Sequence, residues 1–367
     1  MKVEIIDLKK RFQEEKYEIL KCINRVLKKG NFVLTKEVEN FEKSICKFTG
    51  AKYCLGVNSG TDALMMSLWS LGISKGDEVI TSPISFIASA SSIIHVGAKA
   101  VFVDIDYDLN INPELIESAI TKKTKAIMPV HWTGRVCKMD KILKIAKKHN
   151  LAVIEDSAQA MGAYYNNKHA GKFGKISAFS THPLKNLNSL GDGGFIITDE
   201  KKLYEKIKLY RSHGLQGRDN VEIIGVNSRL DSLHAEVLNF RLKRLKNIIY
   251  RRQKNINFYK KLLKTKKVNI IYNKKKEKNA HVMFITLCEK RDELQNYLKK
   301  FNIQSLIYYN TPLHLHKATK FLGYKKGDFP VAEKLSKKVL SFPHHQHLKK
   351  SEIKFVSNKI NNFYRKK

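Results

Sequence analysis

Between residues 53 and 199, short apolar runs alternate with segments whose apolar positions recur every three or four residues. The short runs are typical of buried strands, and the longer period predicts helices. Two of the helical segments, 61–72 and 139–150, finish at Gly72 and Asn150, residue types that favour a helix end. This alternation predicts an α/β fold with a mostly parallel sheet covered on both faces. The predicted strands are 52–58, 77–82, 98–105, 125–132, 151–157, 175–180 and 194–199.

The pattern changes in the last third of the chain, where strand-like runs and helical segments lie between Lys-rich turns. An irregular segment at 214–225 interrupts the helical pattern before that point. We therefore expect a large domain over residues 1–250 and a smaller α+β domain over residues 251–367. The helices predicted beyond the sheet are 201–212, 230–264, 291–301 and 330–340.

Composition supports a packed core, because 43% of the 367 residues are hydrophobic. The net charge of +35 comes from 69 Lys and Arg against 34 Asp and Glu, and the lysines are dispersed along the chain. The densest basic segment, 241–255, has Leu242 and Leu245 at helical spacing, which predicts an amphipathic helix with a solvated basic face. No nucleic-acid-binding module accompanies this charge, so we expect no nucleic-acid partner. A positive field could equally concentrate an anionic substrate.

The sequence gives no sign of membrane insertion or export. The most apolar long stretch, 86–105, is interrupted by polar and charged residues, and the first twenty residues carry charges where a signal peptide needs an apolar run. We expect a cytoplasmic protein without a membrane partner. The five cysteines are scattered without a C-x-x-C pair, which indicates buried thiols rather than a metal site.

Candidate chemistry lies at the ends of the predicted strands, where ligands of open parallel sheets bind. Gly60 and Thr61 stand between a strand and a helix, where free N–H groups can bind an anion. The same Ser-Gly-Thr sequence is also an ordinary helix N-cap. Asp156 ends a buried strand, so its carboxylate needs a partner; capping the next helix is the alternative.

Two further segments gain meaning only from their neighbours. Lys185 follows a strand, between Pro183 and a glycine-rich turn at 191–194, but a lone lysine carries little information in so basic a chain. Phe86 follows the strand at 77–82, and core packing is its alternative role. The order of these segments along the chain is what indicates a function.

In that order the segments resemble the DegT/DnrJ/EryC1/StrS family of pyridoxal-phosphate-dependent sugar aminotransferases, which has the aspartate aminotransferase type of fold (fold type I). The resemblance begins at Asn31-Phe32-Val33-Leu34 and covers almost the whole chain. It continues through VNSGTDAL, EDSAQA, HPLKNL with GDGG, RSHG, GVNSRLDSLHAEVL, TPLHLH and FPVAEKLSKKVLSFP. By this resemblance, the large domain binds pyridoxal 5'-phosphate.

The resemblance implies a role for each cofactor-binding residue. Lys185 would hold the cofactor covalently and then move a proton as base and acid. Asp156 would keep the pyridine nitrogen protonated. The other implied contacts are Gln159 and Phe86 at the ring, and Gly60, Thr61 and Ser180 at the phosphate. Asn227 would reach the phosphate from the neighbouring subunit, so a homodimer with shared active sites is implied.

The implied reaction moves an amino group from glutamate or glutamine to a keto-sugar, expected to be nucleotide-linked, for amino-sugar and surface-polysaccharide biosynthesis. A dehydratase or epimerase of the same fold is one alternative. Dehydratases of this kind replace the lysine by His, so Lys185 argues against that alternative. A nucleic-acid-binding regulator on this scaffold is the other, motivated by the net charge.

Substrate identity is less constrained, because this chain departs from the family pattern near the expected sugar pocket. The loop at 186–192 is longer than the T-T-G-E-G-G form of many members and is similar to the K-N-L-x-x-L-G-D form of others. By this resemblance, amination at C3 is implied rather than at C4. Tyr308 and Asn310 stand where many members have the His and Pro of H-Y-P. The substrate residues implied by the resemblance are Asn31, Trp132, Arg229, Tyr308, Tyr309 and His314.

Overall fold

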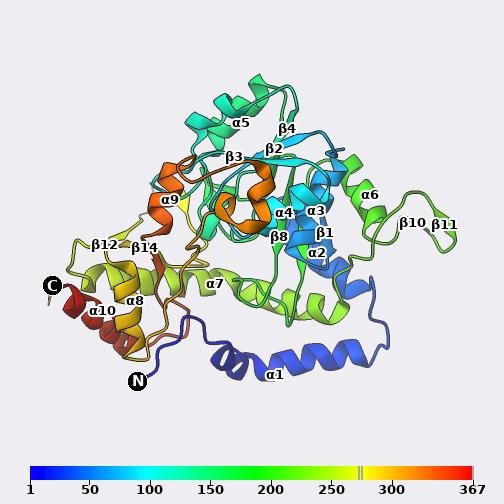
Figure 1. Ribbon diagram of the computed structural model, residues 1–367. Coiled ribbons are helices and arrows are strands. Elements are labelled where there is room, and N and C mark those ends of the chain that lie inside the picture. The colour runs from blue at the N-terminus through cyan, green and yellow to red at the C-terminus, as the bar shows by residue number, and fades with distance from the viewer. Residues whose placement is uncertain (272, 274–275, 366–367) are drawn as a thin grey trace.

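A seven-stranded sheet forms the centre of the computed structural model, which describes residues 1–271, 273 and 276–365 (Figure 1). The strands follow the spatial order β1-β9-β8-β5-β4-β2-β3, and each corresponds to one predicted strand. Their bounds are β1 Tyr53–Val57, β2 Glu78–Thr81, β3 Lys99–Phe102, β4 Thr124–Ile127, β5 Ala152–Asp156, β8 Ile176–Ser180 and β9 Gly194–Thr198.

Strand direction decides which residues share an edge of the sheet. Strands β3, β2, β4, β5 and β8 pair in parallel, whereas β9 is antiparallel to both β8 and β1. Consequently β1 runs parallel to β8, and every strand of the sheet except β9 ends at the same edge. The predicted, mostly parallel sheet is confirmed.

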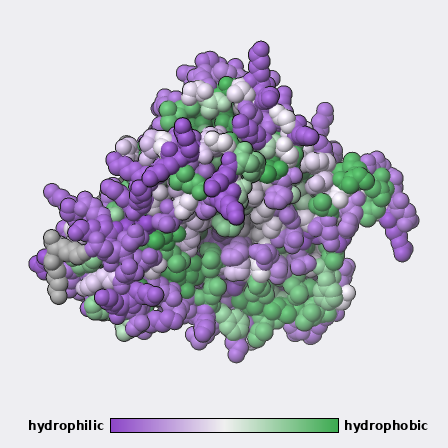
Figure 2. All heavy atoms as spheres, viewed as in Figure 1, coloured by the Kyte–Doolittle hydropathy of each residue, from purple (hydrophilic) through white to green (hydrophobic). Residues whose placement is uncertain are grey.

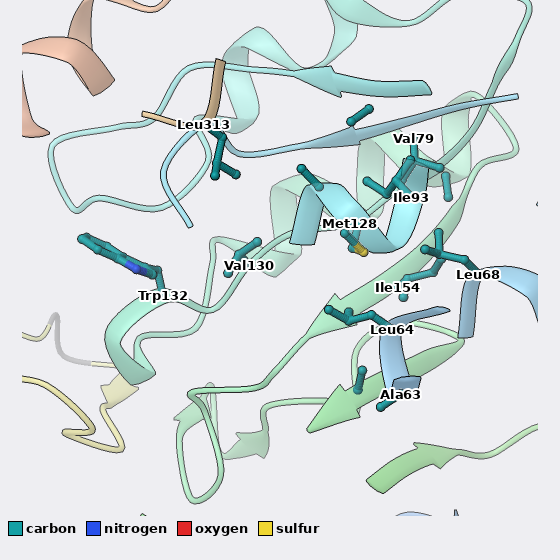
Figure 3. Packing of buried hydrophobic residues seen from close by; sticks show 14 of the residues in the cluster. Ala63, Leu64, Leu68, Val79, Ile93, Met128, Val130, Trp132, Ile154 and Leu313 are labelled. Atoms are coloured by element: carbon teal, nitrogen blue, oxygen red, sulfur yellow. The ribbon is translucent and has the colours of Figure 1, made fainter. Parts of the chain in front are cut away.

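Helices cover both faces because successive side chains of a strand point to opposite sides. In β9, Ile196 packs in the same cluster as Leu64 of α3, whereas Phe195 packs on the other face with Phe41 of α2. Figure 3 shows the first of these clusters, in which side chains of α3 and α4 meet those of β2 and β5. The helices around the sheet are α2 Lys36–Thr49, α3 Gly60–Ser70, α4 Ala88–His95, α5 Met139–Lys148 and α6 Lys201–Tyr210.

The predicted helix ends agree with the backbone. Gly72 follows α3 with φ +78°, and Asn150 follows α5 with φ +51°, both in the left-handed region that those residue types tolerate. Short 3₁₀ helices lie in the connections: η1 Pro113–Leu115, η2 Glu117–Ala119, η3 Trp132–Gly134, η4 Leu313–Leu315 and η5 Lys317–Leu322.

The long helix α7 (Ser232–Leu262) runs below the sheet, and α1 (Leu8–Leu27) lies along its outer side (Figure 1). The expectation of a fully solvated basic face on 241–255 is partly wrong. Arg241 and Arg252 are buried with the apolar residues, because both guanidinium groups have hydrogen-bond acceptors inside the molecule. The remaining basic residues of this segment are exposed or half-buried.

The C-terminal part has its own antiparallel sheet, β12-β14-β15. Its bounds and those of the neighbouring helices are β12 Val268–Ile270, β14 Ile285–Cys288, β15 Val339–Ser341, α8 Arg291–Lys299, α9 Pro330–Ser336 and α10 Lys350–Arg365. The helix predicted over 330–340 is wrong at its end: Val339 and Leu340 pair with β14. Both side chains are buried there, so tertiary pairing overrides the helical pattern.

A second hydrophobic core underlies this part and includes Tyr259 of α7 as well as Phe284 and Phe342. Near the N-terminus, Val3 joins the same core and forms a bridge with Ile303. The boundary expected at 250/251 falls inside α7, and the division into two domains stays a prediction.

Two small strand groups complete the described elements. The first joins β6 (Tyr164–Tyr165), β7 (Lys168–His169) and β13 (Glu277–Lys278). The second is a hairpin of β10 (Leu215–Gln216) and β11 (Asn220–Val221), within the segment predicted to be irregular, and it projects from the body at the right of Figure 1.

Among the described residues, none of the helices has the length and apolarity needed to cross a membrane. The cysteines are free thiols; four are buried and Cys46 is half-buried. The expectation of buried thiols is therefore confirmed for all but one of them.

Candidate active site

The sequence-predicted cofactor residues converge at the edge where β1, β5 and β8 end. Asp156 is the last residue of β5, and Ser180 is the last residue of β8. Lys185 lies in the loop after β8, and Gly60 begins α3 shortly after β1. The parallel direction of these strands is what brings together segments more than a hundred residues apart.

The turn into α3 and the end of β8 approach each other so closely that no side chain fits between them. A Cβ placed on Gly60 would lie 2.7 Å from the Cβ of Ser180. The hydroxyl oxygen of Ser59 caps the helix by accepting a hydrogen bond from the N–H of Asp62 at 3.0 Å. This cap uses the N–H of Asp62 only. The N–H groups of Gly60 and Thr61, in the first turn of the helix, have no partner within the helix and are typical donors to an anion. Capping and anion binding are therefore compatible in this turn.

Asp156 is buried, and its carboxylate accepts a hydrogen bond from Ser89 of α4 at 2.6 Å. Ser89 in turn is hydrogen-bonded to Ser85 at 2.7 Å. Burial raises the pKa of Asp156, while the Ser89 hydroxyl and the positive charge of Lys185 oppose this effect. A buried carboxylate in this position is stabilised by a cationic N–H partner, as a protonated pyridine nitrogen would be.

Lys185 is held in place by the backbone of its own loop. Its N–H donates to the backbone oxygen of His182 at 2.8 Å. Burial lowers the pKa of Lys185 to about 8, and the carboxylate of Asp156 partly offsets the shift. A lysine with a lowered pKa holds more of its uncharged amine near neutral pH than a lysine on the surface does, and the uncharged amine is the form that acts as a nucleophile and as a base.

Gln159 and the aromatic side chains of Phe86 and Tyr309 are the next candidates for contacts with the cofactor or the substrate. The Oε1 atom of Gln159 accepts a hydrogen bond from the N–H of Thr133 at 2.8 Å, which leaves the amide NH₂ as its donor. That orientation fits a hydrogen bond to a ring oxygen of a ligand. Phe86 is 55% exposed, so core packing does not account for it. Its ring centroid lies 6.3 Å from that of Tyr309, which comes from the C-terminal part.

The structure separates the remaining predicted residues into two groups. Asn31 and Asn227 are exposed, and Asn227 accepts a hydrogen bond from Arg229 at 2.9 Å. By contrast, Trp132 and His314 are each only 1% exposed.

The two buried residues differ in their surroundings. The indole N–H of Trp132 has no hydrogen-bond partner among the described residues, and its ring lies near Val130 and Leu313 (Figure 3). His314 is bonded to Glu333 at 3.0 Å and packs edge-on against Phe329. Tyr308 is half-buried against Tyr309.

Sequence reasoning missed several residues that support the site. Glu155, next to Asp156, points to the other face of the sheet, where it accepts a hydrogen bond from His131 at 2.8 Å. Burial would raise the pKa of Glu155, but His131 and the N–H groups of Gly174 and Gly171 lower it. The adjacent pair of acidic residues at a strand end was the available signal, since one of the two had to face away from the site.

Comparison with known proteins identifies this arrangement. The model of the DegT/DnrJ/EryC1/StrS aminotransferase family matches residues 13–361. The chain is 40% identical over 369 residues to a pleiotropic regulatory protein of Geobacillus stearothermophilus, covering 100% of this chain and 99% of that protein. It is 38% identical over 364 residues to the dTDP-3-amino-3,6-dideoxy-alpha-D-galactopyranose transaminase of Aneurinibacillus thermoaerophilus, covering 98% and 99%.

The similarity extends to solved structures. The crystal structure of S. venezuelae DesV in complex with a ketimine intermediate superposes with a TM-score of 0.96 at 34% identity, covering 99% of this chain and 98% of that one. Together the fold and the site define an α/β aminotransferase of the aspartate aminotransferase type. The chain belongs to the DegT/DnrJ/EryC1/StrS aminotransferase family.

The expected fold and the expected sugar aminotransferase class are thereby confirmed. Pyridoxal phosphate is confirmed as the cofactor by a structural relative solved in its PLP form. The roles of individual residues stay predictions.

Proposed function

We propose that this enzyme transfers an amino group from glutamate or glutamine to C3 of a nucleotide-linked keto-sugar, in amino-sugar and surface-glycan biosynthesis. The observation that carries the reaction class is the convergence of the half-buried Lys185 and the buried Asp156 at the shared edge of the sheet, within electrostatic reach of each other. The C3 position is supported by the longer loop at 186–192 and by the A. thermoaerophilus transaminase, whose product is a 3-amino sugar nucleotide.

The residues at this edge fit pyridoxal phosphate. Gly60, Thr61 and Ser180 would hold the phosphate, because the glycine lets the start of α3 come close to Ser180, so that the helix N–H groups and the Ser180 hydroxyl can act on one anion. Asp156 would pair with the pyridine nitrogen, and Gln159 would donate from its free amide NH₂. The ring of Phe86 would stack on the cofactor.

Lys185 would serve the reaction in two ways. The cofactor, when bound, supplies an electron sink for the carbon that loses its proton. Lys185 would hold the cofactor through its neutral amine, and the same amine, once free, would take and return that proton. Burial favours the neutral form that both steps require.

A homodimer with shared active sites is also part of this proposal. Apolar side chains are exposed at 32–34 and around the β10–β11 hairpin, where Ile224 is 89% exposed. Figure 2 shows green, hydrophobic surface gathered along the lower part of this face and near the hairpin. Exposed apolar surface of this kind is typical of an interface. Asn227 and Arg229 stand at its border, so they could reach a partner's site.

The direct test is the absorption spectrum of the purified protein after addition of pyridoxal phosphate. We expect a visible band from cofactor attached to lysine, and its loss in Lys185→Ala. Lys175→Ala is the matched control, because Lys175 is an exposed lysine just before β8 and should leave the band intact. Persistence of the band in Lys185→Ala would refute the assignment of the lysine.

Substrate class is tested by incubating the holoenzyme with glutamate or glutamine and a panel of nucleotide-linked 3-keto and 4-keto sugars. We expect an aminated 3-keto sugar by mass spectrometry. Turnover of a keto-sugar without any amino donor would instead support the dehydratase or epimerase alternative.

The second candidate function is a nucleic-acid-binding regulator. Two observations favour it: the name of the G. stearothermophilus relative and the net charge of +35. It predicts duplex DNA binding that falls steeply with salt and prefers one sequence in competition. Salt-sensitive binding without sequence preference would reflect charge alone. For the aminotransferase, we also propose the cytoplasmic location that the sequence predicts.

A further inference from the structure

The loop that follows Lys185 is held from behind by two arginines of α7. One guanidinium nitrogen of Arg241 donates to the backbone oxygen of Asn188 at 2.8 Å, and Arg252 donates to the side-chain oxygen of Asn186. Both arginines are buried. They are eleven residues apart, about three helical turns, so they lie on the same face of α7. The loop is thus attached to one rigid helix at two points.

The position of Arg241 is fixed in turn by α1. Its Nε atom donates to the carboxylate of Glu15 at 2.9 Å, and Glu15 also pairs with Arg11 at 3.3 Å. Glu15 and Arg11 are each 3% exposed. Loss of one partner from a buried ion pair leaves an uncompensated charge, so the remaining groups must rearrange. Glu15 therefore connects the outermost helix of the molecule to the loop of the reactive lysine.

Arg252 makes the second attachment through neutral partners. Its Nε atom donates to Gln346 at 3.1 Å, and its Nη1 atom donates to the backbone oxygen of His281 at 3.2 Å. Both partners belong to the C-terminal part of the chain. Arg252 thus connects the lysine loop to the C-terminal part. The connection of the loop to α1 is made by Arg241 through Glu15.

A small cavity borders the segment that carries Lys185. It is lined by Lys185, Arg11 and Arg252 among others, and its volume of about 10 Å³ admits about one water molecule. One guanidinium nitrogen of Arg11 has no hydrogen-bond partner among the described residues. Arg241 does not line this cavity; it holds the loop at the backbone oxygens of Asn188 and Ser189, at 2.8 and 3.0 Å.

We propose that Arg241, held by Glu15, is a positioning residue that keeps the ε-amine of Lys185 beside Asp156. The helix α1 then acts as a support of the active site as well as an outer layer of the fold. The inference rests on the proposed function of Lys185 as the cofactor-binding lysine.

The experiment compares four holoenzyme variants. Arg241→Gln and Glu15→Gln break the anchor, and Arg241→Lys keeps the charge but not the forked geometry. Glu236→Gln is the matched control, because it breaks the pair with Arg25 at 2.6 Å, which joins the same two helices without contacting the loop. For each variant we measure the pH midpoint of the visible cofactor band, kcat and KM, the melting temperature and the cofactor content.

We expect Arg241→Gln and Glu15→Gln to retain cofactor, to shift the pH midpoint of the band, and to lower kcat by roughly tenfold or more with little change in KM. Arg241→Lys should fall between these and the wild type, and Glu236→Gln should match the wild type in midpoint and kcat. An unchanged midpoint and kcat in both anchor variants, with only a lower melting temperature, would overturn the inference. A wild-type protein without a visible band would instead refute the proposed function. The two failures can be distinguished because the second is seen before any substitution is made. If Arg241→Gln does not fold, Glu15→Gln and Arg241→Lys decide the outcome.

Discussion

Burial changes the chemistry of the two ionisable groups at the site in opposite directions. Burial favours the uncharged form of each group, so it lowers the pKa of Lys185 to about 8 and raises the pKa of Asp156. Neither side chain carries this property in the sequence alone. The shifts arise because the loop after β8 and the end of β5 enclose both groups.

The lowered pKa of Lys185 predicts the pH dependence of cofactor attachment to the apoprotein. Below about pH 8 the ammonium form predominates and cannot attack, so the rate should rise about tenfold per pH unit and level off above pH 8. Stopped-flow absorbance after mixing with pyridoxal phosphate measures this rate. A lysine-containing peptide in the same buffers is the control, and a rate that rises past pH 10 in both would contradict the shift.

Ser89 should strengthen the hold of Asp156 on the cofactor. Its hydroxyl donates to the carboxylate at 2.6 Å and favours the charged form. We expect Ser89→Ala to weaken cofactor binding by about tenfold, since a hydrogen bond to a charged group contributes about 1.5 kcal/mol or more. Equilibrium dialysis with pyridoxal phosphate measures this affinity.

Ser91→Ala on the same helix is the control for Ser89→Ala. The Ser91 side chain makes no contact with Asp156 among the described hydrogen bonds, so its removal should leave the affinity unchanged. Equal affinities for the two variants would show that the Ser89 hydroxyl does not act on Asp156.

At the level of elements, strand β1 lies at the open edge of the sheet, and two side chains satisfy its backbone there. Glu42 of α2 accepts from the N–H of Gly56 at 2.8 Å, and Arg211 donates to the oxygen of the same residue at 2.7 Å. Glu42 and Arg211 also pair with each other at 2.7 Å. The strand that leads into the Gly60 turn is thereby fixed on its outer edge, where no second strand pairs with it.

We expect Arg211→Gln to lower the free energy of unfolding by about 3 kcal/mol, because it leaves Glu42 and the Gly56 oxygen without their partner in a largely buried place. Urea unfolding followed by circular dichroism measures the change. Lys36→Gln serves as the control, since its pair with Glu39 is exposed and should contribute less than about 1 kcal/mol. Equal losses in the two variants would contradict this role of Arg211.

Over the whole molecule, the proposed dimer is the property that we expect to affect the site most. Ile224 is 89% exposed on the segment that carries Asn227, so Ile224→Asp should weaken self-association by placing a charge in the proposed interface. Sedimentation velocity measures the loss of dimer, and the activity should fall with it.

Leu115→Asp provides the control for this prediction, because Leu115 is also exposed, at 42%, but lies on η1, outside the segments of the proposed interface. A protein that is monomeric and fully active before any substitution would refute shared active sites.

Regular elements and the sites at their ends were predictable from local patterns. The seven strands of the sheet and the cofactor segments could be located because period, turn residues and motif order are local properties. The end of the helix predicted over 330–340 was not predictable from local patterns, because pairing with β14 outweighs helical spacing there. The buried Arg241 and Arg252 were also missed, because their acceptors come from a loop more than fifty residues away.

The sequence by itself determined the order of strands and helices, the glycine at the phosphate turn, and a lysine whose neighbours indicate aminotransferase chemistry. Only the tertiary structure decided that Lys185 and Asp156 come together at one edge of the sheet, that Asp156 is buried and Lys185 half-buried, and that Arg241 binds both Glu15 and the loop after Lys185. The physical reason is that pKa shifts and buried hydrogen bonds depend on groups brought together by the parallel sheet, whereas helical and strand periods depend on neighbours along the chain.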